Sequence, residues 1–203
     1  MWSAAILAGG QARRLGGRDK GQLVIGGQSI LARHLDCLRS LEVEHIVIVG
    51  RYDADDLPPV PVVSDAVDHA GALGGVYTAL LTAPRHHVIV LASDMPFISA
   101  SFLRYLTVQA DGVDAAVPRT AIGRHPLCAV YDRRVAPTLK ERLDRGALRV
   151  VDALDGLHVR DIDPSDVSRF DPDGVLLTNI NTPDDYARAR RYADARDNDR
   201  GRS

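Results

Sequence analysis

The sequence of 203 residues has no run of about 18 apolar residues, so no segment is long enough to cross a membrane as a helix. It has only two cysteines, Cys37 and Cys128, and no CxxC spacing suggests a metal site. One disulfide is arithmetically possible, but we expect two reduced thiols in the core. The net charge of −2, from 25 basic and 27 acidic side chains, lacks the basic excess of a nucleic-acid-binding protein. Without a basic segment ahead of its short first apolar stretch, the chain has no predicted signal peptide, and we expect a cytoplasmic protein.

Short apolar segments alternate with amphipathic segments along the chain. Runs rich in Val, Ile and Ala are typical of strands buried on both faces; they occupy Ala4–Leu7, His45–Val49, Val60–Val63, Val88–Ala92, Ala115–Val117 and Leu127–Tyr131. Apolar residues at helical spacing predict helices over Ser29–Leu41, Gly75–Thr82, Ser99–Gln109 and Arg134–Leu143. A late strand is expected over Leu176–Ile180 and a last helix over Pro183–Ala193. This alternation predicts a three-layer α/β/α fold with a Rossmann-like, doubly wound, mostly parallel sheet.

The chain contains no linker long enough to divide it. We therefore predict a single domain over residues 1–192. Residues 193–203 are predicted to be a disordered tail, because the stretch from Arg196 onward has no apolar side chain to bury.

A glycine-rich segment with several cations follows the first predicted strand, and it reads Leu7-Ala8-Gly9-Gly10-Gln11-Ala12-Arg13-Arg14-Leu15-Gly16-Gly17-Arg18-Asp19-Lys20. Ligands of open α/β sheets bind beyond the carboxyl ends of the strands, which is where this segment is expected. Glycine lets the backbone approach a ligand, and guanidinium and ammonium groups bind phosphates. The spacing fits neither a P-loop nor a G-x-G-x-x-G dinucleotide fingerprint. We interpret the segment as a polyphosphate-binding loop of another class; the alternative is a glycine-rich turn with solvated arginines.

The pattern L-A-G-G-x-x-x-R-x-G-G-x-D-K in this segment resembles the nucleotidyltransferases of the sugar-nucleotide pyrophosphorylase type, and most of all the molybdenum cofactor guanylyltransferases. The resemblance implies that four loop residues bind the nucleotide, namely Leu7, Ala8, Gly9 and Gly10. It also implies that Arg14 and Lys20 are catalytic and stabilise the triphosphate and the departing pyrophosphate.

Two acidic residues follow predicted strands. On its own, Asp94 is equally well interpreted as a Mg²⁺ ligand or as a turn or cap residue. The family carries C-D-x-P-[FY] where this chain has Ser93-Asp94-Met95-Pro96-Phe97, which implies that Asp94 is catalytic and binds Mg²⁺. The resemblance gives Asp65 a nucleotide-binding role, with an ordinary loop carboxylate as the alternative. Gly71-Ala72-Leu73-Gly74-Gly75 resembles the family's G-P-L-[AG]-G loop near the base and triphosphate.

Asn179 and Asn181 precede the last predicted helix, and at this spacing they point the same way on an extended chain. Thr182 is expected to cap that helix and Pro183 to open it. Amides both donate and accept hydrogen bonds, as the edge of a pterin ring requires. The segment resembles the family's N-x-N-T-P-[ED] signature, which implies that Asn179 and Asn181 bind the pterin. Arg124-His125-Pro126-Leu127 also fits the family's middle region.

The resemblance covers roughly residues 4–192 and implies transfer of GMP from GTP to the terminal phosphate of molybdopterin, with release of pyrophosphate and Mg²⁺ as cofactor. A phosphate monoester is mostly dianionic at neutral pH, so the reaction needs no general base. GTP and molybdopterin are the expected partners, with transient contacts to molybdopterin-synthesis proteins and molybdoenzyme chaperones. Val49 stands where some members carry a nucleotide-binding Asn, which leaves guanine selectivity open. The alternatives are a related enzyme that uses CTP or a sugar phosphate acceptor, and a catalytically silent nucleotide-binding protein.

Overall fold

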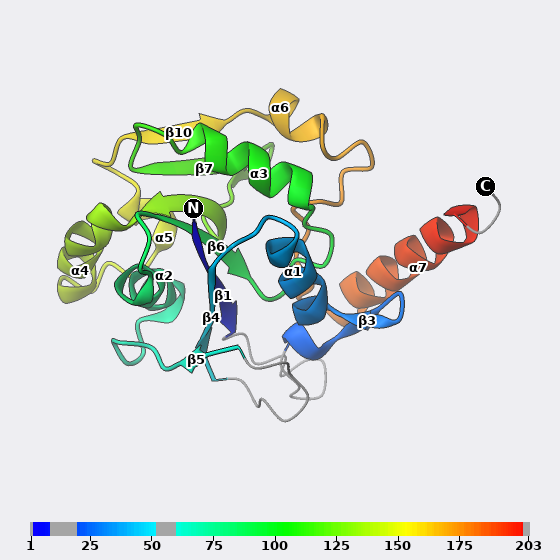
Figure 1. Cartoon of the computed structure of the whole chain (residues 1–203), viewed down its shortest axis with the longest axis horizontal. Coiled ribbons are helices and arrows are strands. Elements are labelled where there is room, and N and C mark those ends of the chain that lie inside the picture. Colours follow the sequence, from blue (N-terminus) through cyan, green and yellow to red (C-terminus); the bar gives the residue numbers. More distant parts are fainter. Residues whose placement is uncertain (1, 9–19, 52–59, 201–203) are drawn as a thin grey trace.

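The computed structural model describes residues 2–8, 20–51 and 60–200, with side chains up to residue 196. Figure 1 shows a central sheet between helices, with the last helix extending away from the body. The layers and the mostly parallel sheet confirm the predicted fold class. No helix within these ranges combines the length and the apolar character needed to span a membrane.

The sheet has the strand order β10-β7-β9-β6-β1-β4-β5, with β8 paired to β7. The strands are β1 (Ser3–Ala8), β4 (His45–Gly50), β5 (Val62–Val63), β6 (His87–Ala92), β7 (Ala115–Thr120), β8 (Gly123–Arg124), β9 (Cys128–Asp132) and β10 (Val159–Ile162). β9 runs antiparallel to its neighbours β6 and β7, whereas the other neighbours in this order are parallel. The carboxyl ends of β1, β4 and β6 therefore meet at one edge of the sheet.

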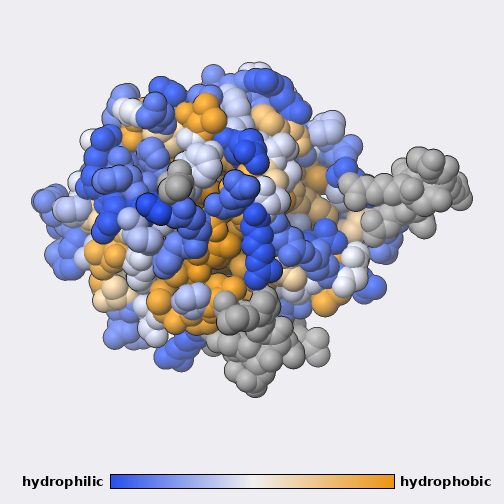
Figure 2. Space-filling model, viewed as in Figure 1, coloured by the Kyte–Doolittle hydropathy of each residue, from blue (hydrophilic) through white to orange (hydrophobic). Residues whose placement is uncertain are grey.

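Helices cover both faces of this sheet. They are α1 (Ile30–Arg39), α2 (Gly71–Thr82), α3 (Ala100–Gln109), α4 (Ala136–Asp144), α5 (Val150–Ala153), α6 (Pro164–Ser168) and α7 (Pro183–Arg200). Alternate residues of β1 pack into two separate cores: Ala4 and Ile6 pack with α1 and α3, and Ala5 packs with α2 and α4. The strands are thus buried on both faces, as their apolar runs predict. On the face shown in Figure 2, hydrophilic side chains cover most of the outer helices, and hydrophobic surface gathers in the hollow between them.

Local capping explains where two helices begin. Ser29 Oγ accepts a hydrogen bond from the Ala32 N–H at 3.2 Å, and Ser99 Oγ accepts one from the Phe102 N–H at 3.3 Å. Each cap satisfies an N–H that has no partner inside its helix. Between the 3₁₀ turn η2 (Lys20–Gln22) and α1 lies a small hairpin of β2 (Val24–Ile25) and β3 (Gln28–Ser29).

The predicted strand over Leu176–Ile180 is wrong, because this segment lies in turns and irregular structure. Gly174 has a φ of +69°, and the Val175 N–H donates to Asp171 Oδ1 at 2.7 Å, so side-chain and turn hydrogen bonds replace a ladder. The apolar residues are nevertheless buried in the core. One backbone bond, from the Ile180 N–H to the Asp94 carbonyl at 2.9 Å, ties the segment to the end of β6.

The structure also differs from the sequence-based expectation at β10 and at the end of α7. β10 is absent from that expectation, because its sequence Val-Arg-Asp-Ile lacks an apolar run. Helix α7 continues to Arg200, so residues 193–200 of the predicted disordered tail are helical. A hydrogen bond from Arg196 Nη1 to Tyr192 Oη at 3.0 Å, one helical turn apart, supports this extension. Residues 201–203 lie outside the described part of the chain.

Candidate functional site

The floor of the candidate site is the closely packed edge where β1, β4 and β6 end. Ala8 of β1 pairs with Gly50 of β4, and the Ser93 N–H donates to the Leu7 carbonyl at 3.2 Å. Gly50 has a φ of +113°, and a Cβ added there would overlap the Ala8 carbonyl oxygen. Only glycine fits this close approach of two backbones.

A cavity of about 290 Å³ opens at this edge. It brings together five residues predicted to bind the nucleotide: Leu7, Ala8, Lys20, Asp65 and Asp94. Gly71, Ala72 and Gly75 also line it, because α2 begins at Gly71, four residues before the predicted start. The first turn of a helix presents N–H groups without intrahelical partners, which suits an anionic ligand. Gly9, Gly10 and Arg14, the other predicted nucleotide and catalytic residues, lie outside the described residues.

Asp94 is the centre of a polar network at the mouth of this cavity. Its Oδ2 accepts a hydrogen bond from Lys20 Nζ at 3.0 Å, and its Oδ1 accepts one from Asn179 Nδ2 at 3.1 Å. Lys20 Nζ also donates to Asn181 Oδ1 at 2.6 Å. The side chains of the Lys20–Asp94 ion pair are 12% and 14% exposed, so water screens the pair weakly.

The same contacts bear on the capping alternative for Asp94, which lies in the turn after β6. Within the described ranges, its carboxylate accepts from side chains and from no backbone N–H, so Asp94 caps no helix there. The helix that follows is capped by Ser99. The carboxylate of Asp94 therefore serves the polar network with Lys20 and Asn179 rather than a helix end.

A reciprocal cap fixes the segment that carries the two asparagines. Asp185 Oδ2 accepts from the N–H groups of Asn181 and Thr182, at 3.1 and 2.9 Å, and the Asp185 N–H donates to Thr182 Oγ1 at 3.1 Å. This confirms Thr182 as the cap of α7. A hydrogen bond from the Thr182 side chain, followed by the bonds from the N–H groups of Asn181 and Thr182, holds the pKa of Asp185 below its usual range.

His34 supports the turn that follows Asp94 from the opposite side. Its Nε2 lies 2.6 Å from the Met95 carbonyl oxygen, so Nε2 carries the hydrogen and donates. The ring is buried, and burial lowers its pKa despite the opposing effects of this hydrogen bond and of the Asp94 charge. Its buried Nδ1 has no hydrogen-bond partner in the described part of the chain. Nothing in the local sequence pattern distinguishes His34 from an ordinary core residue of α1.

The carboxylates at this edge suit a cation that is shared with a substrate. Asp65 and Asp94 line the same cavity, and partial burial followed by the charge of Asp68 raises the pKa of Asp65. The described residues contain no cluster of three or more His, Cys, Asp or Glu that could hold a metal by itself. One or two carboxylates completed by phosphate oxygens are the usual arrangement for Mg²⁺ in nucleotide enzymes.

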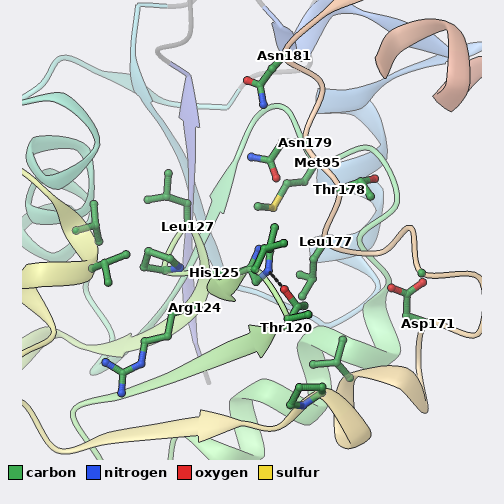
Figure 3. A pocket seen from close by; sticks show the side chains of 18 of the residues that line it. Met95, Thr120, Arg124, His125, Leu127, Asp171, Leu177, Thr178, Asn179 and Asn181 are labelled. Carbon is green, nitrogen blue, oxygen red and sulfur yellow. Dashed lines mark hydrogen bonds between the residues drawn. The ribbon is translucent and has the colours of Figure 1, made fainter. Parts of the chain in front are cut away.

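A second, larger cavity of about 1040 Å³ lies next to the first, and the two share Ala72 and Leu127. Asn179 and Asn181 line the larger cavity, and their hydrogen bonds reach Asp94 and Lys20 in the smaller one. Figure 3 shows this cavity with Met95, His125, Leu127 and Leu177 around its centre. The network therefore stands on the boundary between two binding spaces. The sequence motifs point to the asparagines but give no role to His125.

Comparisons with known proteins place the chain in one family. Residues 4–159 match the MobA-like NTP transferase domain. The chain is 32% identical to a molybdenum cofactor guanylyltransferase of Desulfosudis oleivorans, over 91% of this chain and 92% of that protein. It is 34% identical to a probable molybdenum cofactor guanylyltransferase of Chloroflexus aggregans, over 95% of each. The solved molybdopterin-guanine dinucleotide biosynthesis protein A of Archaeoglobus fulgidus superimposes with a TM-score of 0.81 and 27% identity, over 96% of this chain and 100% of that one.

Proposed function

The chain belongs to the MobA-like NTP transferase family and is a nucleotidyltransferase, and we propose that it transfers GMP from GTP to the terminal phosphate of molybdopterin. The observation that carries this proposal is the Lys20–Asp94–Asn179–Asn181 network on the boundary of two adjoining cavities. An in-line transfer needs the attacking oxygen of the acceptor and the departing pyrophosphate on opposite sides of the α-phosphorus. The smaller cavity offers the nucleotide side and the larger cavity the acceptor side.

In the proposed reaction, an oxygen of the acceptor's phosphate forms a bond to the α-phosphorus of GTP. The bond between that phosphorus and the bridging oxygen to the β-phosphate breaks, and pyrophosphate leaves with its electron pair. The attacking phosphate is already largely dianionic, so no protein base is required. The protein has to align the two substrates and offset their negative charge.

Lys20 provides the positive charge that the described residues bring to the network. We propose that its ammonium group moves from Asp94 to the triphosphate and stabilises the departing pyrophosphate. Arg14, Gly9 and Gly10 are proposed to complete the triphosphate site with Leu7 and Ala8.

The proposed metal is Mg²⁺, which Asp94 would hold together with phosphate oxygens, and Asp65, which lines the same cavity, is proposed to bind the nucleotide. When bound, such a divalent cation neutralises charge on the phosphates. Asp94 also orients Lys20 and Asn179 through its two oxygens, so the carboxylate has a positioning role of its own.

Asn179 and Asn181 are proposed to bind the pterin-bearing acceptor. In the described part of the chain, Asn179 is bonded through its amide nitrogen and Asn181 through its amide oxygen. The Asn179 oxygen and the Asn181 nitrogen are the groups that face no protein partner there. One is an acceptor and the other a donor, which matches the mixed edge of a pterin.

The product is a cofactor that other proteins use, and we include transient contacts with molybdopterin-synthesis proteins and molybdoenzyme chaperones in the proposal.

CTP is the second candidate substrate. Val49 lines the nucleotide cavity with an apolar, buried side chain, which offers the base no hydrogen bond. Equilibrium binding of GTP, CTP, ATP and UTP in the presence of Mg²⁺ tests base selection. Pyrophosphate release with each nucleotide and molybdopterin then tests transfer. We expect release with GTP; equal release with CTP would contradict guanine selectivity, and binding without release would identify a silent nucleotide-binding protein.

A further inference from the structure

We propose that His125, anchored by Thr120, is a binding residue for the acceptor and presents its free ring nitrogen to the pterin. This inference rests on the proposed function and concerns the acceptor side of the site. It assigns a role to the Arg124-His125-Pro126-Leu127 segment, which has no role in the proposed binding of the nucleotide.

The His125 side chain is held rigidly. Its Nε2 lies 2.8 Å from Thr120 Oγ1, and the residue is 9% exposed. Its backbone N–H donates to the Pro118 carbonyl at 2.8 Å, and its carbonyl accepts from the Cys128 N–H at 3.1 Å. Both the ring and the backbone are therefore fixed by β7 and by the start of β9.

This rigid ring lies inside the larger cavity. Figure 3 shows His125 between Met95 and Thr120, with the dashed bond joining it to Thr120. Two residues further on, the Leu127 carbonyl accepts a hydrogen bond from the Ala92 N–H at 2.7 Å. That bond fastens the segment beside the end of β6, just ahead of Asp94. His125 thus stands on the acceptor side of the network.

The chemistry of the ring suits a heterocyclic ligand. Burial lowers the pKa of His125 and so favours the neutral ring, in which one nitrogen donates and the other accepts. The Thr120 hydroxyl can donate or accept, so it tolerates either tautomer. Nδ1, which has no hydrogen bond in the described part of the chain, can therefore serve either a donor or an acceptor on the ligand. Met95, Leu127 and Leu177 line the same cavity, and an apolar surrounding of this kind strengthens a hydrogen bond.

The test compares molybdopterin binding, followed by pterin fluorescence without GTP, with GTP binding to the same proteins. His125→Leu removes both ring nitrogens, whereas His125→Asn keeps an amide near the position of Nδ1. Thr120→Val removes the anchor and leaves the ring. The matched control is His45→Leu, which changes a half-buried histidine at the amino end of β4, the opposite edge of the sheet. Thermal unfolding of each protein reports any general loss of structure.

We expect His125→Leu to weaken molybdopterin binding by about 10-fold, the effect of losing one hydrogen bond to a ligand, and to leave GTP binding unchanged. His125→Asn and Thr120→Val should lie between this variant and the wild type, and His45→Leu should bind like the wild type. If His125→Leu does not fold, His125→Asn and Thr120→Val decide. Unchanged molybdopterin binding in folded variants, or equal weakening of both ligands, would overturn this inference alone. A wild-type protein that does not bind molybdopterin would overturn the proposed function and this inference with it.

Discussion

Replacing Asp94 with asparagine removes one negative charge from the site and nearly preserves the shape of the side chain. In the wild type, the two carboxylate oxygens accept hydrogen bonds from Lys20 Nζ at 3.0 Å and from Asn179 Nδ2 at 3.1 Å. An amide has a single oxygen, so one donor would face the new NH₂ group instead of an acceptor. The largely buried ion pair between Lys20 and Asp94 is lost, and solvation by water replaces only a small part of its stabilising free energy.

We expect the free energy of unfolding to fall by about 2 kcal/mol, within the range of about 1.5–3 kcal/mol for a hydrogen bond to a charged group. For a domain of this size, that loss lowers Tm by about 4–8 °C. The sequence alone predicts unchanged or slightly higher stability, because Asp65 would repel a nearby Asp94 carboxylate. The structure reverses this expectation by placing Lys20 against Asp94.

The rate of pyrophosphate release from GTP and molybdopterin should fall by about 10²–10³-fold, because the variant loses the charge that orients Lys20 and that a divalent cation needs. High Mg²⁺ or Mn²⁺ should restore part of the rate. Thermal unfolding and pyrophosphate release are measured on the same sample. Asp36→Asn, which changes an exposed carboxylate, should leave both unchanged. A folded Asp94→Asn protein with near wild-type activity would refute the role assigned to this carboxylate.

Three further predictions follow from the contacts. Lys20→Ala should lower kcat by about 10²-fold with a much smaller change in GTP binding, as steady-state kinetics and equilibrium binding would show; a retained kcat would contradict its role on the leaving group. His34→Gln, which keeps a donor near the position of Nε2, should retain most activity, whereas His34→Met should lose about 10-fold in kcat; equal activities would show that the bond to the Met95 carbonyl does not position Asp94. Two hydrogen bonds from Arg124, at 2.6 and 2.7 Å, lower the pKa of Asp161 in the folded protein. The pair therefore stabilises the fold fully above the unfolded pKa of about 3.9, and this stabilisation is lost as the pH falls through the folded pKa. Denaturant unfolding of Asp161→Asn should therefore show a deficit of about 1 kcal/mol at pH 7 that disappears as the pH falls through the folded pKa of Asp161. A deficit independent of pH would be inconsistent with this account.

The central strands could be predicted from the sequence because strands that are buried on both faces consist almost entirely of apolar residues. β1, β4 and β6 are buried on both faces, so almost every residue in them is apolar. β10 gives no such signal, because it lies at an edge of the sheet and carries Arg160 and Asp161. Its pairing with β7 and the ion pair between Asp161 and Arg124 make it a strand, and neither appears in a local pattern.

The segment before α7 shows where the reasoning from apolar periodicity fails. Leu176, Leu177 and Ile180 are buried, so their hydrophobicity was informative about the core. It was not informative about the backbone, because turns built on Asp171 and Gly174 satisfy the polar groups without a neighbouring strand. A strand and a buried turn can carry the same short apolar run.

In the candidate site, too, the sequence identifies residues but does not show how they contact one another. The motifs single out Lys20, Asp94, Asn179 and Asn181 and give them separate ligands: a triphosphate, a metal and a pterin. In the folded chain these side chains bond to one another, across separations of 74 to 161 residues. Local spacing cannot show such bonds, because only the meeting of η2, the end of β6 and the start of α7 creates them. We therefore expect their roles to be coupled, because a substrate that binds one member changes the hydrogen bonds of the next.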